Sequence, residues 1–170
     1  MLEGITVKHI QKILDERGWF VELLRKDWSD WKELFGNDEV VQVNHSFSYQ
    51  NVVRAWHMHQ RGQNDYFLVL SGTAKICAYD DKTRELDEVY SSEDMHQIVK
   101  VPGKYWHGFK VVGNTPTILL YFVNKLYDYK SPDEVRRPWN DPTIVPLSIN
   151  GTTKDSRCGK PWDWFSPPYK

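Results

Sequence analysis

Short runs of apolar and β-branched residues alternate with turn signals from about residue 40 to residue 124. Turn-forming pairs such as Ser-Gly, Pro-Gly and Gly-Asn separate these runs at intervals of about 8–12 residues, a spacing typical of β-sandwiches and barrels. The pattern therefore predicts an all-β fold. The predicted strands are Val40–Ser48, Val52–His57, Tyr66–Ser71, Ala74–Tyr79, Gln97–Val101, Gly108–Val112 and Ile118–Val123.

The segments on either side of this core have weaker patterns. Ile5–Leu24 is predicted to form two extended segments around a turn at Asp15–Gly18, and Ser29 is expected to cap a short helix over Asp30–Phe35. The Ser131–Glu134 segment resembles a helix start, and the Pro-rich tail after it has little periodicity. Neither flank indicates a second core, so we expect one domain over residues 1–170.

Composition excludes several classes of partner. The 22 basic and 23 acidic residues are mixed along the chain, for a net charge of −1, which argues against nucleic acid as a partner. No apolar run approaches the length of a membrane span, and the N-terminus lacks signal-peptide features, so no membrane partner and a cytoplasmic location are expected. Cys77 and Cys158 are expected to be reduced thiols.

Three histidines occupy positions that the strands of a barrel can bring together. His57 and His59 are two residues apart on an apparent strand, so their side chains project to the same face, and His107 opens a later strand. The arrangement resembles the two short motifs of the cupin superfamily. Gln63 and Asn64 occupy the neighbourhood where metal-binding cupins have an acidic residue, so we expect no metal or other cofactor. A metal ion held by His57, His59 and His107 is the alternative.

Further segments extend the resemblance over nearly the whole chain. They are Asp15–Glu22, Gln42–Ser48, Arg54–His57, His107–Phe109, Trp139–Pro142 and Lys154–Asp155. In these the chain resembles the dTDP-4-dehydrorhamnose 3,5-epimerases, which act on nucleoside-diphosphate 4-keto-6-deoxysugars. The resemblance implies a cupin-type jelly-roll barrel with short flanking helices, and a homodimer that exchanges its N-terminal strands. It also implies an isomerase of dTDP-rhamnose and polysaccharide biosynthesis that binds a nucleotide-sugar and uses no cofactor.

The same resemblance assigns substrate binding to residues from several segments. The arginines among these residues would bind the diphosphate through forked, charge-assisted hydrogen bonds. The residues near the N-terminus would reach the partner subunit's site. The full set of expected substrate-binding residues is Arg17, Phe20, Glu22, Gln42, Asn44, Arg54, His59, Asp65, Tyr66, Phe122, Glu134 and Lys154.

Epimerisation removes a proton from the carbon next to a ketone and returns one to the other face. By resemblance, His57 is the base and Asp155 orients it, with Asp141 as the alternative partner. His107 would direct a hydrogen-bond donor toward the sugar or the enolate oxygen.

The chain departs from the family pattern at two catalytic positions. Asp65 stands where the family has a lysine, and Phe122 stands where it has a tyrosine acid, although the adjacent Tyr121 substitutes after a shift of one residue. The preferred hypothesis is a 3,5- or single-carbon epimerase in which His59, Tyr66 or Tyr121 replaces these partners beside the substrate. The alternatives are a metal-dependent cupin and a non-catalytic nucleotide-sugar-binding homologue. The His-x-His pair also resembles that of the sugar 3,4-ketoisomerases.

Overall fold

A computed structural model describes residues 1–167, in which the regular structure is nearly all β and the one helix, α1 (Trp31–Phe35), lies outside the sheets. The strands are β1 (Thr6–His9), β2 (Ile13–Asp15), β3 (Gly18–Phe20), β4 (Gln42–Ser48), β5 (Val53–His59), β6 (Asn64–Ser71), β7 (Thr73–Tyr79), β8 (Glu85–Ser92), β9 (Gln97–Pro102), β10 (Trp106–Val112), β11 (Thr117–Val123), β12 (Glu134–Arg136) and β13 (Ser148–Ile149).

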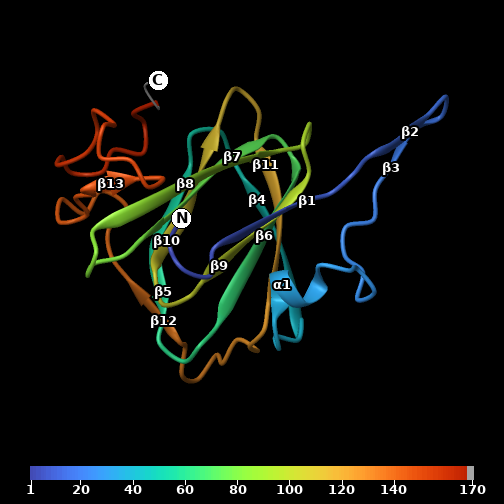
Figure 1. The fold of residues 1–170 in the computed structure, drawn as a ribbon, viewed down its shortest axis with the longest axis horizontal. Coiled ribbons are helices and arrows are strands. Elements are labelled where there is room, and N and C mark those ends of the chain that lie inside the picture. The colour runs from blue at the N-terminus through green and yellow to red at the C-terminus, as the bar shows by residue number, and fades with distance from the viewer. Residues whose placement is uncertain (168–170) are drawn as a thin grey trace.

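Two sheets form the body of the molecule. The five-stranded sheet has the order β1-β9-β6-β11-β4, and the six-stranded sheet has the order β12-β5-β10-β7-β8-β13. Side chains from both sheets, among them Phe67, Leu119, Ile76 and Val111, form the apolar core between them. This arrangement is the cupin-type barrel, and β2 and β3 form a separate hairpin that extends away from it (Figure 1).

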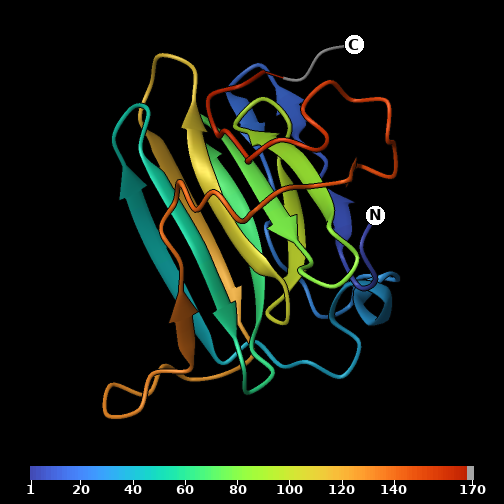
Figure 2. The same ribbon diagram turned by 90° about the vertical axis from the view of Figure 1, so that its left-hand side faces the viewer.

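Part of the outer face of each sheet is covered. On the five-stranded sheet, Leu34 and Phe35 of α1 pack against strands β6, β9 and β11. On the six-stranded sheet, the C-terminal segment crosses the strands and buries Trp162 and Trp164 there (Figure 2). No helix in residues 1–167 is long and apolar enough to cross a membrane.

The register between β5 and β10 determines which side chains of β5 face the interior. His107 pairs with His57, but the next pair is Phe109 with Arg54, so the register shifts between them. Gly108 lies at this shift, where an added Cβ would be 2.5 Å from the Arg54 carbonyl oxygen and 2.3 Å from the Ala55 Cβ. Irregular pairing of this kind changes the direction of side chains. His57 and Arg54 therefore face the same interior space.

All seven strands predicted from the central pattern are confirmed, as is the N-terminal pair around its turn. Strand β8 was not predicted, because the charged pair Asp87 and Glu88 interrupts its apolar pattern. Both side chains are buried and paired, Asp87 with the backbone N–H of Leu2 and Glu88 with Arg157. A charged side chain can be buried in a strand when a hydrogen-bonding or oppositely charged partner is buried with it.

Two predictions about helices in the flanks are wrong. Asp30, not Ser29, occupies the N-cap of α1, and its side chain makes no capping hydrogen bond. The Ser131–Glu134 segment does not start a helix. It leads into β12, because β5 would otherwise present an unpaired edge and Glu134 pairs with His59 there.

Candidate active site

A cavity of about 320 Å³ lies between the two sheets, close to the edges formed by β4 and β12. Both sheets contribute to its walls, so residues far apart in sequence face one another across it. The lining residues are Ser46, Val53, Arg54, Ala55, Trp56, His57, His59, Asp65, Phe67, Phe109, Tyr121, Glu134 and Arg136.

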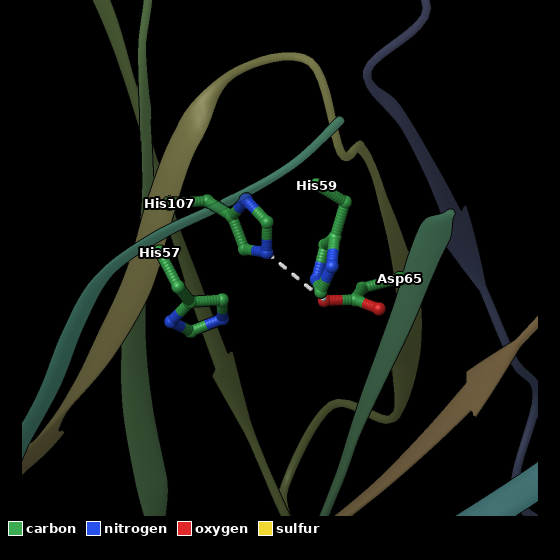
Figure 3. A group of neighbouring side chains, drawn as sticks. All are labelled: His57, His59, Asp65 and His107. Carbon is green, nitrogen blue, oxygen red and sulfur yellow. Dashed lines mark hydrogen bonds and ion pairs between the residues drawn. The ribbon is translucent and has the colours of Figure 1, made fainter. Parts of the chain in front are cut away.

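Three histidines and one aspartate meet at the inner end of the cavity (Figure 3). The ring centroids of His57 and His107 are 4.3 Å apart, and those of His59 and His107 are 5.5 Å apart. One ligand atom from each of His57, His59, Asp65 and His107 lies within 4.8 Å of the others. The predicted convergence of the histidines is therefore formed.

Asp65 is the acidic member of this cluster. Its Oδ2 lies 2.9 Å from His107 Nε2 and 3.5 Å from His59 Nε2, while its Oδ1 accepts a 2.8 Å hydrogen bond from Gln63 Nε2. Burial raises the pKa of the Asp65 carboxyl, but hydrogen bonds and charges from His107 and His59 outweigh burial and hold the pKa well below its usual range. The carboxyl is therefore ionised.

The expectation that Gln63 and Asn64 leave the cluster without an acidic residue is wrong. Asn64 turns outward, where its side chain donates to Asp38. Because side chains alternate along a strand, the next residue of β6, Asp65, turns inward toward the histidines. The alternation of β6 was the signal that would have identified Asp65 as a possible ligand.

The cluster shifts the pKa values of His57 and His59 in opposite directions. Burial, and next the charge of His107, lower the pKa of His57 well below its usual value, so its ring is neutral at pH 7. Burial also lowers the pKa of His59, but the hydrogen bond and charge of Asp65 outweigh it and raise the pKa overall. His59 Nδ1 has no hydrogen-bond partner and lies 3.9 Å from Asp133 Oδ2, which is also unpaired.

The structure does not pair Asp155 with His57. Arg157 Nε and Nη2 donate to the two Asp155 oxygens at 3.0 and 2.8 Å, and Arg157 Nη1 donates to Glu88 on β8 at 2.9 Å. Glu88 pairs in register with Cys77, which faces the outer side of the six-stranded sheet, whereas His57 faces the cavity. The sheet therefore separates the two residues.

The alternative partner, Asp141, is also engaged elsewhere, because its Oδ1 accepts from the Thr143 backbone N–H and hydroxyl at 2.9 and 2.7 Å. Lys154 is exposed in the same C-terminal region as Asp155 and does not line the cavity.

The alternation of side chains along β11 determines whether Tyr121 or Phe122 faces the cavity at the position of the family's tyrosine acid. Tyr121 faces the cavity, and Phe122 points to the other side of the sheet, where it packs in the cluster under α1. Tyr66 lies in that same outer cluster, fully buried, with its hydroxyl donating to Asp38 at 2.6 Å. Tyr66 and Phe122 therefore face away from the cavity, and their prediction as substrate-binding residues is wrong. Burial, and next the charge of Asp65, raise the pKa of Tyr121, so its hydroxyl is protonated at pH 7.

The expected binding residues divide into two groups. Arg54 and Glu134 line the cavity, and Gln42 and Asn44 lie on the same face of β4 as the cavity-lining Ser46. The second group lies away from the cavity of its own chain: Arg17 pairs with Asp15 on the projecting hairpin, Phe20 is exposed on β3, and Glu22 follows the hairpin and pairs with Arg25.

Arg136 was not predicted as a site residue. It lies at the cavity beside Glu134, whose Oε1 accepts from Arg136 Nε at 2.8 Å. Its position depends on β12, a strand that the sequence pattern did not predict. In an extended segment, Glu134 and Arg136 lie on the same face. This alternation would have predicted that Arg136 lies beside Glu134.

Comparisons with known proteins agree with this fold. The family model for dTDP-4-dehydrorhamnose 3,5-epimerase matches residues 1–158. The chain is 36% identical over 144 residues to the probable low-salt glycan biosynthesis epimerase Agl13 of Haloferax volcanii, covering 82% of this chain and 89% of that one. It is 38% identical over 149 residues to the spore coat polysaccharide biosynthesis protein SpsL of Bacillus subtilis, covering 85% and 94%.

A solved structure shows the same fold. The dTDP-6-deoxy-D-glucose-3,5-epimerase RmlC of Legionella pneumophila, crystallised with dTDP-4-keto-L-rhamnose, superposes with a TM-score of 0.72 at 22% identity, covering 89% of this chain and 86% of that one. The family match and the two curated relatives each span most of this chain. The chain therefore belongs to the dTDP-4-dehydrorhamnose 3,5-epimerase family, a family of isomerases that epimerise carbohydrates.

Proposed function

We propose that the protein epimerises a nucleoside-diphosphate 4-keto-6-deoxysugar at one or both carbons next to the ketone. The observation that carries this proposal is the placement of His57 and Tyr121 on opposite walls of one cavity, on β5 and β11 of different sheets. Inverting a carbon requires a proton acceptor on one face of the sugar and a proton donor on the other. A sugar ring between the sheets would have one group on each face.

His57 is the base in this scheme. Its ring faces the cavity, and no side chain in the described residues hydrogen-bonds to it. The C–H bond next to the ketone breaks, its proton passes to the imidazole, and the electron pair moves to the ketone oxygen to give an enolate. Tyr121 then gives its phenolic proton to the same carbon from the opposite face. The two residues regain their starting protonation through exchange with water.

The mouth of the cavity suits a diphosphate. Arg54 and Arg136 line it, and neither is held by a buried ion pair: Arg54 Nε donates to the Ser48 hydroxyl, and Arg136 pairs with Glu134 at the surface. Guanidinium groups bind phosphate oxygens through paired hydrogen bonds. The solved relative with dTDP-4-keto-L-rhamnose supports a dTDP-sugar as the first substrate to test.

The proposal includes a homodimer. The β2–β3 hairpin leaves four large apolar side chains exposed to solvent, which a monomer rarely does: Ile13, Leu14, Trp19 and Phe20, at 53–77% exposure. The hairpin projects away from the barrel (Figure 1). Packing against a second copy would cover it and would bring Arg17 and Phe20 to the partner's cavity.

Deuterium exchange tests the function directly. The protein is incubated in D₂O with 4-keto-6-deoxysugars on dTDP, UDP and GDP, and deuterium at C3 and C5 is followed by NMR. We expect exchange at one or both carbons, and a loss of at least about 10²-fold in His57→Gln, the size expected for removal of a general base. His9→Gln, a change on the exposed end of β1, is the matched control. No exchange with any of these sugars would refute the proposal and indicate a non-catalytic homologue.

A further inference from the structure

Three side chains direct possible metal-ligand atoms at one point inside the barrel. They are His59 on β5, Asp65 on β6 and His107 on β10, and all three are buried (Figure 3). Asp65 Oδ2 is the common centre, 2.9 Å from His107 Nε2 and 3.5 Å from His59 Nε2. Their different strands hold them in place, so the convergence is a property of the fold.

Neighbouring polar groups orient the members of this cluster. The Tyr105 carbonyl oxygen lies 2.8 Å from His107 Nδ1 and can only accept, so Nδ1 donates to it and Nε2 is the ring nitrogen that faces the Asp65 carboxylate. Gln63 Nε2 lies 3.1 Å from His59 Nε2 and donates to Asp65 Oδ1 at 2.8 Å, so the Gln63 amide contacts both residues. One nitrogen from each of the two histidine rings and one carboxylate oxygen therefore converge, as the ligands of a metal ion do.

The distances fit a metal ion. Zinc and similar ions lie about 2.0–2.2 Å from histidine nitrogen and carboxylate oxygen, which places neighbouring ligand atoms about 2.8–3.6 Å apart at octahedral to tetrahedral angles. Both separations from Asp65 Oδ2 lie in this range. Tyr105 and Gln63 supply the hydrogen bonds that orient metal-binding histidines and carboxylates.

We propose that His59, Asp65 and His107 bind one divalent transition-metal ion of the zinc, manganese or iron(II) class. Two histidines and one carboxylate leave open coordination positions, and here these face the cavity and His57. His57 is not needed as a ligand.

The site gives the ion a role that rests on the proposed function. An enolate needs positive charge at its oxygen, and no lysine is present among the described residues that line the cavity. The Asp65 carboxylate alone would repel an enolate. A divalent ion bound by one carboxylate retains a net positive charge and acts as a Lewis acid on the ketone oxygen. The ion would change the electrostatic potential at the inner end of the cavity from negative to positive.

Cobalt(II) binding tests the site without any substrate. The full-length protein is stripped with EDTA and titrated with Co²⁺, with calorimetry and visible absorption as readouts. We expect one ion per chain with the absorption bands of Co²⁺ in a nitrogen and oxygen site. Asp65→Asn and His107→Gln should each weaken binding by at least about 100-fold, because loss of even an outer hydrogen-bond partner costs about 10–100-fold. His9→Gln and His57→Gln should retain binding.

Two results would overturn the site: no stoichiometric binding by the wild-type protein, or binding that survives both Asp65→Asn and His107→Gln. The wild-type spectrum decides the question even if a variant fails to fold. Its catalytic role is tested separately by the deuterium assay, where the stripped protein should exchange more slowly and recover with added metal. Undiminished exchange after stripping would refute that role. Metal binding without exchange of any sugar would refute the proposed function and leave the metal site standing.

Discussion

His107 Nε2 lies 2.9 Å from Asp65 Oδ2, and this contact joins the two sheets at the inner end of the cavity. His107 comes from β10 of the six-stranded sheet and Asp65 from β6 of the five-stranded sheet. Neither side chain is exposed to bulk solvent. The pair therefore contributes to the stability of the barrel as well as to the chemistry of the cavity.

Removing one member of this pair should destabilise the metal-free protein strongly. In EDTA, His107→Ala should lower the free energy of unfolding by about 3–5 kcal/mol, because it leaves the buried Asp65 carboxylate without its main partner. Adding Asp65→Asn should recover part of the loss, since the unpaired charge is then gone. Urea denaturation measures both changes. A further loss in the double variant would contradict this account.

Tyr121→Phe should separate proton removal from inversion. His57 can still remove a proton and return it to the same face, so deuterium exchange should persist. Formation of the inverted sugar should fall by about 10²–10⁴-fold, the usual contribution of a general acid. NMR follows both products in one experiment. Tyr129→Phe, at a tyrosine that is 86% exposed, is the control, and equal loss of exchange and inversion would argue against Tyr121 as the acid.

Asp155→Asn should affect stability more than catalysis. Its carboxylate binds Arg157 on the outer face of the six-stranded sheet, away from His57. We expect a lower free energy of unfolding by urea denaturation and a deuterium-exchange rate within about threefold of wild type, since a positioned partner of the base would instead matter by orders of magnitude. A loss of about 10³-fold or more in a folded variant would show that Asp155 does orient His57 in solution.

Trp164→Ala should open the C-terminal cover of the six-stranded sheet. Trp164 is 1% exposed, and its ring centroid lies 4.7 Å from that of Trp56, the residue before His57. Truncating a buried tryptophan typically costs about 3–5 kcal/mol. Thermal and urea unfolding measure the loss, with Phe165→Ala as the neighbouring control because Phe165 is half exposed. Equal effects of the two changes would mean that the tail is not anchored through Trp164.

The hairpin should control assembly. Leu14→Glu and Phe20→Glu place charges on its exposed apolar side chains, so a dimer formed through them should dissociate. Analytical ultracentrifugation should show a dimer for wild type and a monomer for the double variant. Leu147→Glu, at another exposed leucine, is the control. A wild-type monomer, or a dimer that survives both changes, would refute the hairpin as the interface.

Local sequence pattern predicted much of the fold. The period-2 runs and turn signals of the central strands are short-range features, and they identify all seven predicted strands correctly. The pattern failed where a strand depends on distant partners. In β8 the charges of Asp87 and Glu88 are compatible with burial only because the N-terminus and Arg157 reach them. In β12 three residues become a strand because the edge of β5 is available for pairing.

The sequence by itself determined that three histidines share the interior of a β-barrel, because strand alternation fixes the face on which His57 and His59 lie. Only the tertiary structure decided their companions. It brought Asp65 to His107, placed Tyr121 rather than Phe122 in the cavity, and put Asp155 behind the sheet. The physical reason is that these contacts depend on the register between strands and on which face of a sheet a distant segment covers. Neither can be predicted from the local pattern of residues in one sequence.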